Sequence, residues 1–569
     1  MLHALKHNAD LDGLLALPAF AHADAELIEA ALSEAGRLAE DRLAPLYVTG
    51  DRQGARFEAG RVTLPDGFSQ AYREFAAGGW NGLPFAEAHG GQGLPWALAV
   101  AVAEIVHGAN TGFGLCPLLS QSLIEALIGH GSERQRMRVL PKLIAGTWTG
   151  TMCLTEPQAG TDVGAVRTRA EPDGDAYRLF GQKIYITYGE HDLAENIVHL
   201  VLARLPDAAP GTKGLSLFLV PKYRINDDGA LGARNDVRCL SIEHKLGIHA
   251  SPTCVLSFGD DGGGAYGELV GEAHDGMRAM FTMMNNARVM VGVEGVGIAE
   301  RAWQHALLYA RERIQGRIRG QPAAIIRHRD VQRMLATMQA LVQASRALAL
   351  YAASQIDLSV QATGADARAY ASRRLALLTP MVKAWCTDCA VRVADLGLQV
   401  HGGMGYVEET GAAQIFRDAR ITPIYEGTNG VQAMDLAGRK LDLAGGLAFD
   451  ELLGDLRAWR DAIDRQAPDL AAGLQPALEA LSSAVVFLRE TADGDQRAAA
   501  ATPFLQLAAM TIAGSLLARQ AVARDASPGL IGSARFFICQ LLPSASAQLG
   551  AVVAPADGLS AALADVLGD

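Results

Sequence analysis

Glu426 is the side chain whose surroundings point most directly to chemistry. It follows the apolar and aromatic residues Ile424 and Tyr425 and precedes a Gly-Thr pair that is typical of a turn. An apolar environment disfavours an ionised carboxyl group, so we expect the pKa of Glu426 to rise toward neutrality. A carboxylate with such a pKa can remove a weakly acidic proton from carbon, whereas an arbitrary glutamate after a proline-containing loop would simply face solvent.

The segment 152–162 is a second candidate site, because an expected strand there runs into a turn rich in Gly, Thr and Asp. Small residues with exposed N–H and hydroxyl groups can approach a pyrophosphate or a flavin edge, although an ordinary β-turn has the same composition. The sequence has no Gly-x-Gly-x-x-Gly that opens a helix after a strand. A Rossmann-type nucleotide site is therefore not indicated.

Two further segments favour contact with a cofactor. Strand alternation would place Tyr185 and Thr187 on one face, which suits a flat heteroaromatic ring, although an exposed strand face would look the same. A predicted helix ends near His401 at Gly402, Gly403 and Gly405. A helix end needs only one glycine, so three within four residues indicate close approach of the backbone to a ligand.

Taken together, these segments resemble the acyl-CoA dehydrogenase family over roughly residues 25–440. The resemblance rests on motifs that occur in this order: Leu-Thr-Glu-Pro-x-Ala-Gly-Thr-Asp at 154–162, Lys-Ile-Tyr-Ile-Thr at 183–187, Asn-Ala-Arg at 286–288, Gln-Val-His-Gly-Gly-Met-Gly-Tyr at 399–406 and Ile-Tyr-Glu-Gly-Thr at 424–428. With its additional C-terminal segment, the chain looks like the longer bacterial branch that includes 3-methylmercaptopropionyl-CoA dehydrogenases.

The resemblance implies an enzyme that binds FAD and oxidises an acyl-CoA thioester to a trans-2-enoyl-CoA. Glu426 would remove the α-proton, a hydride would pass from the β-carbon to flavin N5, and an electron-transfer flavoprotein would accept the electrons. The backbone N–H of Glu426 would donate to the thioester carbonyl. Two alternatives remain open: an acyl-CoA oxidase that uses oxygen, and a non-catalytic or nucleic-acid-binding relative on the same scaffold.

The resemblance also assigns residues to the two ligands. The residues implied in FAD binding are Leu154, Thr155, Gly160, Thr161, Tyr185, Thr187, Arg313, Gln399, Gly403 and Thr428. The residues implied in substrate binding are Arg288, Tyr425 and Gly427. Some relatives carry the catalytic glutamate directly before the equivalent of Arg288, but Ala287 occupies that position here.

The texture of the sequence predicts an α+β multidomain protein. We expect an N-terminal helical domain at 1–150, a central β-barrel or sandwich domain at 151–275, a C-terminal four-helix bundle with the catalytic loop at 276–440, and an appended helical domain at 441–569. The appended segment has fifteen Asp and Glu against eight Lys and Arg. The longer branch suggests a homodimer.

Composition limits the other function classes. The net charge of −12 argues against a nucleic-acid binder. Seven irregularly spaced cysteines indicate a reducing cytoplasm, and Cys386 and Cys389 fall within an expected helix rather than at a redox or metal site. His401 lacks a second metal ligand, so no metal is expected. The uncharged stretch 498–518 is long enough to span a membrane, but its Ala, Thr, Gln and Gly content favours a helix buried in protein.

Overall fold

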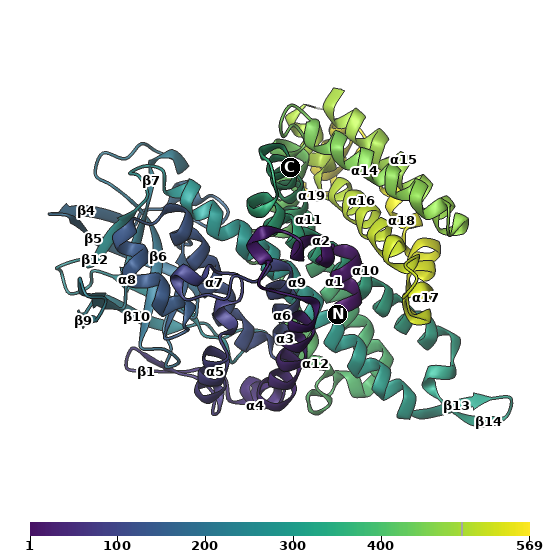
Figure 1. The fold of residues 1–569 in the computed structure, drawn as a ribbon, viewed down its shortest axis with the longest axis horizontal. Coiled ribbons are helices and arrows are strands. Elements are labelled where there is room, and N and C mark those ends of the chain that lie inside the picture. Colours follow the sequence, from purple (N-terminus) through teal and green to yellow (C-terminus); the bar gives the residue numbers. More distant parts are fainter. Residues whose placement is uncertain (491–492, 569) are drawn as a thin grey trace. The chain divides into compact units, whose positions relative to one another are not determined.

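The computed structural model describes residues 1–490 and 493–568. Clustering of contacts divides the chain into two compact units, each assembled from separate stretches of sequence. The helical unit contains Met1–Ser33, Pro95–Glu104 and Arg288–Asp569, and the mixed unit contains Glu34–Leu94 and Ile105–Ala287. Helices dominate toward both ends of the chain and strands dominate its middle, which confirms the α+β fold class (Figure 1).

An eight-stranded sheet is the centre of the mixed unit. Its strands are β3 (Trp148–Cys153), β4 (Arg169–Asp173), β5 (Ala176–Thr187), β6 (Asn196–Arg204), β7 (Leu215–Pro221), β10 (Val237–Ile242), β11 (Thr253–Phe258) and β12 (Ala265–Val270). The order is β10-β11-β5-β12-β7-β6-β3, and β4 pairs with β5 and β6. The first half of β5 pairs with β12 and its second half with β11, so one long strand joins two parts of the sheet. The predicted β-rich character of the middle of the chain is therefore confirmed.

Helices and two small hairpins complete the mixed unit. These elements are α4 (Pro45–Gln53), β1 (Arg56–Glu58), β2 (Arg61–Thr63), α5 (Phe68–Ala77), α7 (Thr111–His130), α8 (Glu133–Ile144), β8 (Tyr223–Ile225) and β9 (Leu231–Arg234). Helix α7 packs on β3, and the hydroxyl of Tyr188 donates to the carbonyl of Gly112 on α7 at 2.7 Å. This buried bond fixes the end of β5 against the helix layer.

Two helices, α3 (Ala25–Leu38) and α6 (Trp96–Ala109), contain the periodic stretches predicted near 25–46 and 97–107. The first stretch is not one uninterrupted helix. A π-helical turn at Ala39–Leu43 follows α3, and α4 begins at Pro45, where a proline fits the first turn of a helix.

Long helices form the core of the helical unit. They are α9 (Gly276–Glu312, in this unit from Arg288 onward), α10 (Arg329–Gln361) and α11 (Ala365–His401), and α10 packs along α11. The predicted break at 316–322 is a hairpin of β13 (Ile314–Ile318) and β14 (Gln321–Ala324). An ion triad joins α6, α9 and α10, because Arg346 on α10 bonds Glu104 on α6 at 2.8 Å and Glu300 on α9 at 2.6 Å.

The sequence predicts a loop that carries Glu426 within 403–440, followed by another helix, whereas the structure has a helix on each side of the turn. Helix α12 (Ala412–Ala419) comes before the turn that carries Glu426, and α13 (Asn429–Asp435) follows it. Helix α12 is strongly amphipathic, with Ile415 and Ala419 buried. It is a packed helix that the sequence analysis did not predict.

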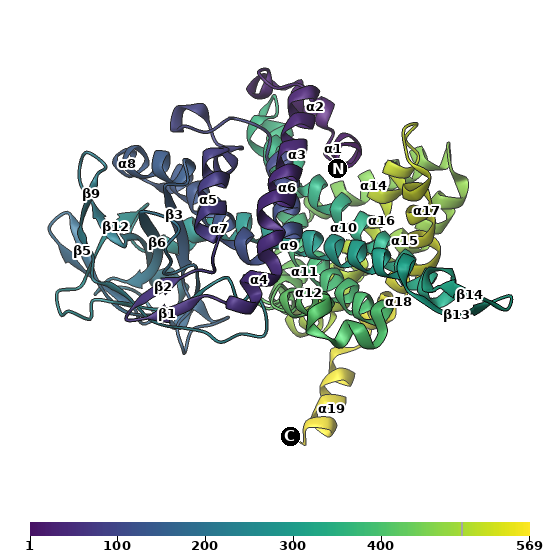
Figure 2. The ribbon, with the colours of Figure 1, turned by 90° about the horizontal axis from the view of Figure 1, so that it is seen from below.

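The C-terminal extension is helical, as predicted. Its helices are α14 (Leu447–Asp464), α15 (Pro468–Glu490), α16 (Gly494–Ala521), α17 (Pro528–Phe536), α18 (Pro543–Val552) and α19 (Ala556–Leu567). The N-terminal helices α1 (Leu2–Asn8) and α2 (Leu11–Leu15) belong to the same unit. Helix α16 packs against α15 and α18 and also against α10 and α11 of the bundle (Figure 1). Helix α19 extends away from the other helices of its unit (Figure 2).

Among residues 1–490 and 493–568, three single helices are long and apolar enough to cross a membrane by composition alone: α7, α15 and α16. Within the structure, 83% of the most apolar window of α7 is buried, 50% of that of α15 and 78% of that of α16. The predicted helix at 498–518 is therefore a packed element whose apolar residues contact other parts of the protein.

Candidate active site

Glu426 lies in the turn between α12 and α13. Its own φ of +56° and the φ of +80° at Gly427 place two successive residues in the left-handed region. Thr428 then caps α13, because its hydroxyl oxygen accepts from the N–H of Val431 at 3.3 Å. A left-handed conformation at a glutamate is costly, and such strain concentrates at functional sites. The predicted Gly-Thr turn is confirmed.

The surroundings of Glu426 raise its pKa, as the sequence predicts. Burial raises the pKa of Glu426 to about 7, and the positive charges of Arg288 and Lys383 offset part of that effect. Both cations are buried, and burial of Glu426 outweighs their combined effect on its pKa. The predicted direction of the shift is therefore confirmed.

This pKa predicts the acid limb of the pH profile. Glu426 can act as a base only when it is ionised, so activity should be present above about pH 7 and lost as the pH falls. We expect kcat/KM to fall about tenfold for each pH unit well below the pKa. Stopped-flow flavin reduction across this range checks the prediction, and a rate that stays constant from neutrality down to pH near 5 would contradict it.

The backbone of the turn is held from two sides. Arg288 on α9 donates to the carbonyl of Glu426 at 3.4 Å, and Gln432 on α13 donates to the carbonyls of Glu426 and Gly427 at 3.4 and 3.3 Å. A side chain at Gly427 would come within 2.8 Å of the Gln432 amide, so glycine is needed for space as well as for φ. The three residues implied in substrate binding, Arg288, Tyr425 and Gly427, thus lie in or against this turn.

Two buried charged residues that the sequence reading did not single out also hold the turn. Glu294 on α9 accepts a hydrogen bond from the hydroxyl of Tyr425. Lys383 on α11 donates to the side chain of Asn429 at 2.8 Å, and Asn429 donates to the hydroxyl of Thr387 at 3.0 Å. Isolated charges within largely apolar helical runs were the signal that could have identified Glu294 and Lys383.

The predicted flavin loop lies in the mixed unit, directly after β3. Leu154 is buried and Thr155 half-buried, whereas Gly160 and Thr161 are exposed. Glu156 fixes the loop from below, since its carboxylate accepts from Lys183 at 2.8 Å and from the N–H groups of Arg167 and Thr168 at 2.7 and 3.0 Å. An ion pair and two backbone hydrogen bonds thus anchor the loop.

The charges of this pair are strongly coupled. Burial alone would raise the pKa of Glu156, but the Lys183 ammonium and the hydrogen bonds to the carboxylate outweigh it and hold the pKa at about 2. Lys183 is completely buried and also donates to the carbonyl of Leu154 at 2.9 Å. The loop and β5 are therefore joined by a charged pair that has little access to water.

Tyr185 lies at a bulge in β5. Its exposure therefore does not result from the regular strand alternation that the sequence analysis assumed. Its φ is +60°, and the pairing with β11 shifts between Lys183 and Ile186, so regular alternation does not continue through this point. Ile186 is buried, whereas Tyr185 is 60% exposed and Thr187 is half-exposed. The ring and the hydroxyl remain available to a ligand, but a bulge rather than simple alternation presents them.

Family models describe most of the chain. Residues 26–147 match the acyl-CoA dehydrogenase N-terminal domain, residues 151–260 the middle domain and residues 274–441 the C-terminal domain. Residues 452–562 match a domain described as acetyl-CoA dehydrogenase C-terminal like. The chain belongs to the acyl-CoA dehydrogenase family. It is therefore an enzyme of the flavoprotein oxidoreductase class, and its cofactor is FAD.

Individual relatives agree with this family. The chain is 44% identical to a 3-methylmercaptopropionyl-CoA dehydrogenase of Ruegeria pomeroyi over 98% of both chains. It is 33% identical to a butyryl-CoA dehydrogenase of Syntrophomonas wolfei, over 94% of this chain and 90% of that one. An acyl-CoA dehydrogenase of Bacillus anthracis solved with FAD has the same fold, with a TM-score of 0.75 at 22% identity over 92% of this chain and 87% of that one.

The predicted FAD contacts in the mixed unit of this chain are compatible with a bound FAD. The exposed ring of Tyr185 and the exposed rim at Gly160 and Thr161 offer an aromatic surface and a small-residue loop, and a Cβ at Gly160 would meet nothing within 4 Å. The other predicted contacts, Arg313, Gln399, Gly403 and Thr428, belong to the helical unit and are all exposed. Their surfaces are thus accessible, whereas the structure does not show a shared contact among these four.

Cys386, Cys389 and His401 have structural roles. Cys386 and Cys389 are buried in α11, and burial raises the pKa of both thiols, that of Cys389 to about 12. His401 is buried, bonds the carbonyl of Gly397 at 2.7 Å and stacks on Tyr309 at 4.3 Å between ring centroids. Neither position therefore resembles a reactive site.

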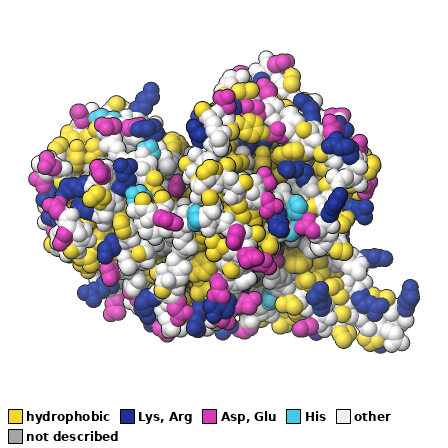
Figure 3. All heavy atoms as spheres, in the orientation of Figure 1, with side chains coloured by type: hydrophobic (Ala, Val, Ile, Leu, Met, Phe, Trp, Pro, Cys, Tyr) yellow, Lys and Arg dark blue, Asp and Glu magenta, His cyan; other side chains and the backbone are white. Residues whose placement is uncertain are grey.

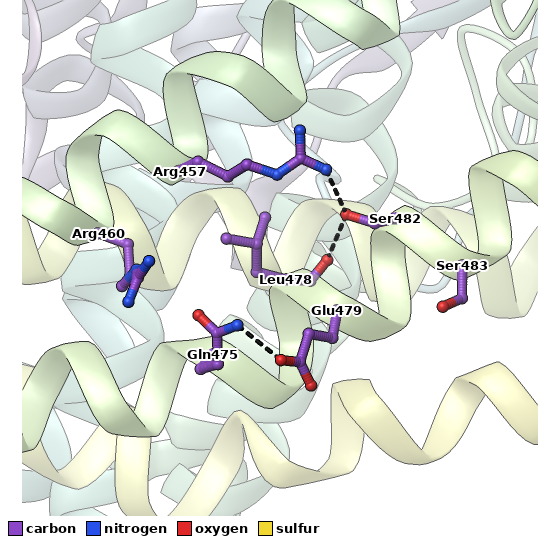
Figure 4. A pocket seen from close by; sticks show the side chains of 7 residues that line it. All are labelled: Arg457, Arg460, Gln475, Leu478, Glu479, Ser482 and Ser483. Atoms are coloured by element: carbon purple, nitrogen blue, oxygen red, sulfur yellow. Dashed lines mark hydrogen bonds between the residues drawn. The ribbon is translucent and has the colours of Figure 1, made fainter.

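Two other groups of polar side chains lie away from the predicted site residues. In the described part of the chain, His3, His7 and Asp525 bring three possible metal ligands together, and the two histidines already bond the carboxylate at 3.1 and 2.9 Å. A pocket of about 300 Å³ opens between α14 and α15 (Figure 4). Its lining residues are Arg457, Arg460, Gln475, Leu478, Glu479, Ser482 and Ser483.

Proposed function

We propose that Glu426 is the base that removes the α-proton of an acyl-CoA thioester, and that the product is the trans-2-enoyl-CoA. The observation that carries this proposal is a half-buried glutamate in a strained turn whose pKa is raised to about 7. At this pKa about half of the carboxyl groups are ionised at pH 7, and the carboxylate is basic enough to accept a proton from carbon.

The chain's own groups would prepare this step. The N–H of Glu426 would donate to the thioester carbonyl, which makes the α-proton more acidic and stabilises the enolate by a few kcal/mol. Arg288 and Lys383 would keep Glu426 ionised, and Gln432 would hold the turn that aims it. When bound, FAD supplies the acceptor for the β-hydrogen as hydride, at flavin N5.

We propose a short, sulfur-containing acyl-CoA as the first substrate to test. Support comes from the 44% identity to a 3-methylmercaptopropionyl-CoA dehydrogenase, which extends over 98% of both chains and so includes the extension. Butyryl-CoA is the second choice, because relatives with 33% and 36% identity carry that name. A panel of thioesters that differ in length, branching and sulfur content, mixed anaerobically with the holoenzyme, ranks them by rate of flavin bleaching.

We propose an electron-transfer flavoprotein as the electron acceptor. An acyl-CoA oxidase that reduces oxygen is the alternative. Turnover with an artificial electron acceptor and little peroxide would support the dehydrogenase, whereas stoichiometric peroxide in air would favour the oxidase. A holoenzyme that no acyl-CoA reduces would overturn the proposed function itself.

The remaining proposals concern organisation and location. We propose four domains at 1–150, 151–275, 276–440 and 441–569, a homodimer, and a cytoplasmic enzyme without a membrane span. Free thiols at all seven cysteines support a reducing compartment. Acidic and basic side chains are interspersed over the face drawn in Figure 3, and with the net charge of −12 this argues against a nucleic-acid-binding relative.

A further inference from the structure

Glu294 is a buried carboxyl group one side chain away from the base. It lies on α9 with none of its surface exposed, and it accepts a hydrogen bond from the hydroxyl of Tyr425. Tyr425 directly precedes Glu426, so this contact connects α9 to the strained residue of the turn, in addition to the hydrogen bond from Arg288 to the carbonyl of Glu426. Burying a carboxyl group without a paired charge is costly, which calls for a reason beyond packing.

The surroundings of Glu294 favour its protonated form near neutral pH. Burial raises its pKa to about 8; the hydrogen bond from Tyr425 and the charge of Lys383 lower it, and the charges of Asp418 and Glu426 raise it. The second carboxyl oxygen, Oε1, has no hydrogen-bond partner among the residues that the structure describes. An ionised Glu294 would therefore accept only one hydrogen bond from the protein, whereas in water both of its oxygens would be hydrated. This difference favours the protonated form.

The two carboxyl groups influence each other's ionisation. Glu426 faces the positive charges of Arg288 and Lys383, and Glu294 faces Lys383 and Asp418 as well as Glu426. While Glu294 is neutral, Glu426 can be the ionised member of the pair. Once Glu294 also loses its proton, two negative charges share the site, and the pair titrates in two steps.

We infer that Glu294 is a positioning residue for the base, acting through the Tyr425 hydroxyl on the orientation and ionisation of Glu426. The inference rests on the proposed role of Glu426 and deepens it. Glu294 itself touches neither the thioester nor the flavin in this scheme. Its contribution is to fix the residue before the base and to remain uncharged while the base is ionised.

Three variants of the FAD-loaded protein separate these roles. Glu294→Gln keeps an acceptor for Tyr425 but cannot ionise, Glu294→Ala removes both properties, and Tyr425→Phe removes the donor. Anaerobic flavin reduction is measured from acid to alkaline pH with a short saturated acyl-CoA, alongside Tyr309→Phe as a control for the loss of a tyrosine hydroxyl. Retained flavin absorbance shows that each protein is folded.

We expect the wild type to show two inflections and Glu294→Gln only one, with a rate near neutrality within about threefold of the wild type. Glu294→Ala and Tyr425→Phe should be slower by about ten- to a hundredfold, since misplacing a catalytic group by about 1 Å can cost about a hundredfold in rate. For Glu294→Ala, KM should change less than kcat, because Glu294 does not touch the substrate in this scheme. The control should match the wild type.

Two results would overturn the inference. One is a Glu294→Gln profile with the same two inflections as the wild type; the other is a Glu294→Ala or Tyr425→Phe enzyme that matches the wild type in rate and profile. If Glu294→Ala fails to fold, the other two variants still decide. Failure of the proposed function would look different, because the wild type itself would then reduce no flavin with any acyl-CoA.

Discussion

Replacing Glu426 by Gln should slow the reduction of bound flavin by acyl-CoA by about 10²–10⁴-fold, the usual contribution of a general base. Gln has nearly the same shape, so it preserves the turn and its contacts with Arg288 and Gln432. It cannot accept the α-proton, however, because an amide is a far weaker base than a carboxylate with a pKa of about 7. Single-turnover bleaching of the flavin absorbance is the measurement.

Glu29→Gln is a matched control for this experiment. Glu29 lies exposed on α3, and its carboxylate is remote in sequence from every predicted site residue. It should reduce flavin at the wild-type rate. If Glu426→Gln retained the full rate, the assignment of the base would be wrong; if it lost FAD, the defect would be in binding instead.

Replacing Lys183 by Met should destabilise the flavin loop by about 3–5 kcal/mol, because it leaves the buried Glu156 carboxylate without its cation. Both side chains are almost completely buried, and the ammonium also bonds the carbonyl of Leu154, within the predicted flavin contact. We therefore expect a lower unfolding temperature and loss of FAD during gel filtration. Flavin fluorescence on heating reports both effects.

Lys142→Met is the control, since Lys142 is an exposed lysine of the same unit. The double variant Glu156→Gln with Lys183→Met should recover part of the lost stability, because no unpaired charge then remains buried. A Lys183→Met protein that kept its FAD and unfolded within about one degree of the wild type would show that the pair does not support the loop.

The sequence was sufficient for features whose signals are local. The catalytic turn followed from Gly427 and from the apolar residues before Glu426, and the strands of the sheet followed from short β-rich runs between turn signals. The long helices followed from sustained periodicity. The raised pKa of Glu426 was also foreseeable, because two neighbouring apolar side chains already indicate an environment poor in water.

Features that depend on distant parts of the chain were not predictable. Glu294 and Lys183 meet their partners across 131 and 27 residues of sequence, and no local pattern pairs them. The bulge at Tyr185 depends on the register with β11, which one strand alone cannot reveal. Helix α12 was not predicted, because its eight residues are too few for a clear helical period and it begins directly after Gly411.

A raised pKa does not by itself identify the base. Burial also raises the pKa of Glu125 on α7 to about 7 and that of Glu294 to about 8. Of these three groups, only Glu426 combines such a shift with a left-handed backbone and the opposing charges of two cations. The geometry therefore selects among three carboxyl groups that electrostatics alone would leave equivalent.

Exchange of the α-hydrogen with solvent deuterium isolates the proton-transfer step. An acyl-CoA whose β-carbon carries no hydrogen, such as 3,3-dimethylbutyryl-CoA, cannot give up a hydride, so it reports α-proton removal alone. With this compound, the wild-type holoenzyme should catalyse incorporation of deuterium at the α-carbon, and Glu426→Gln should not exceed the rate in buffer. Equal exchange by both proteins would contradict the role of Glu426 as the base.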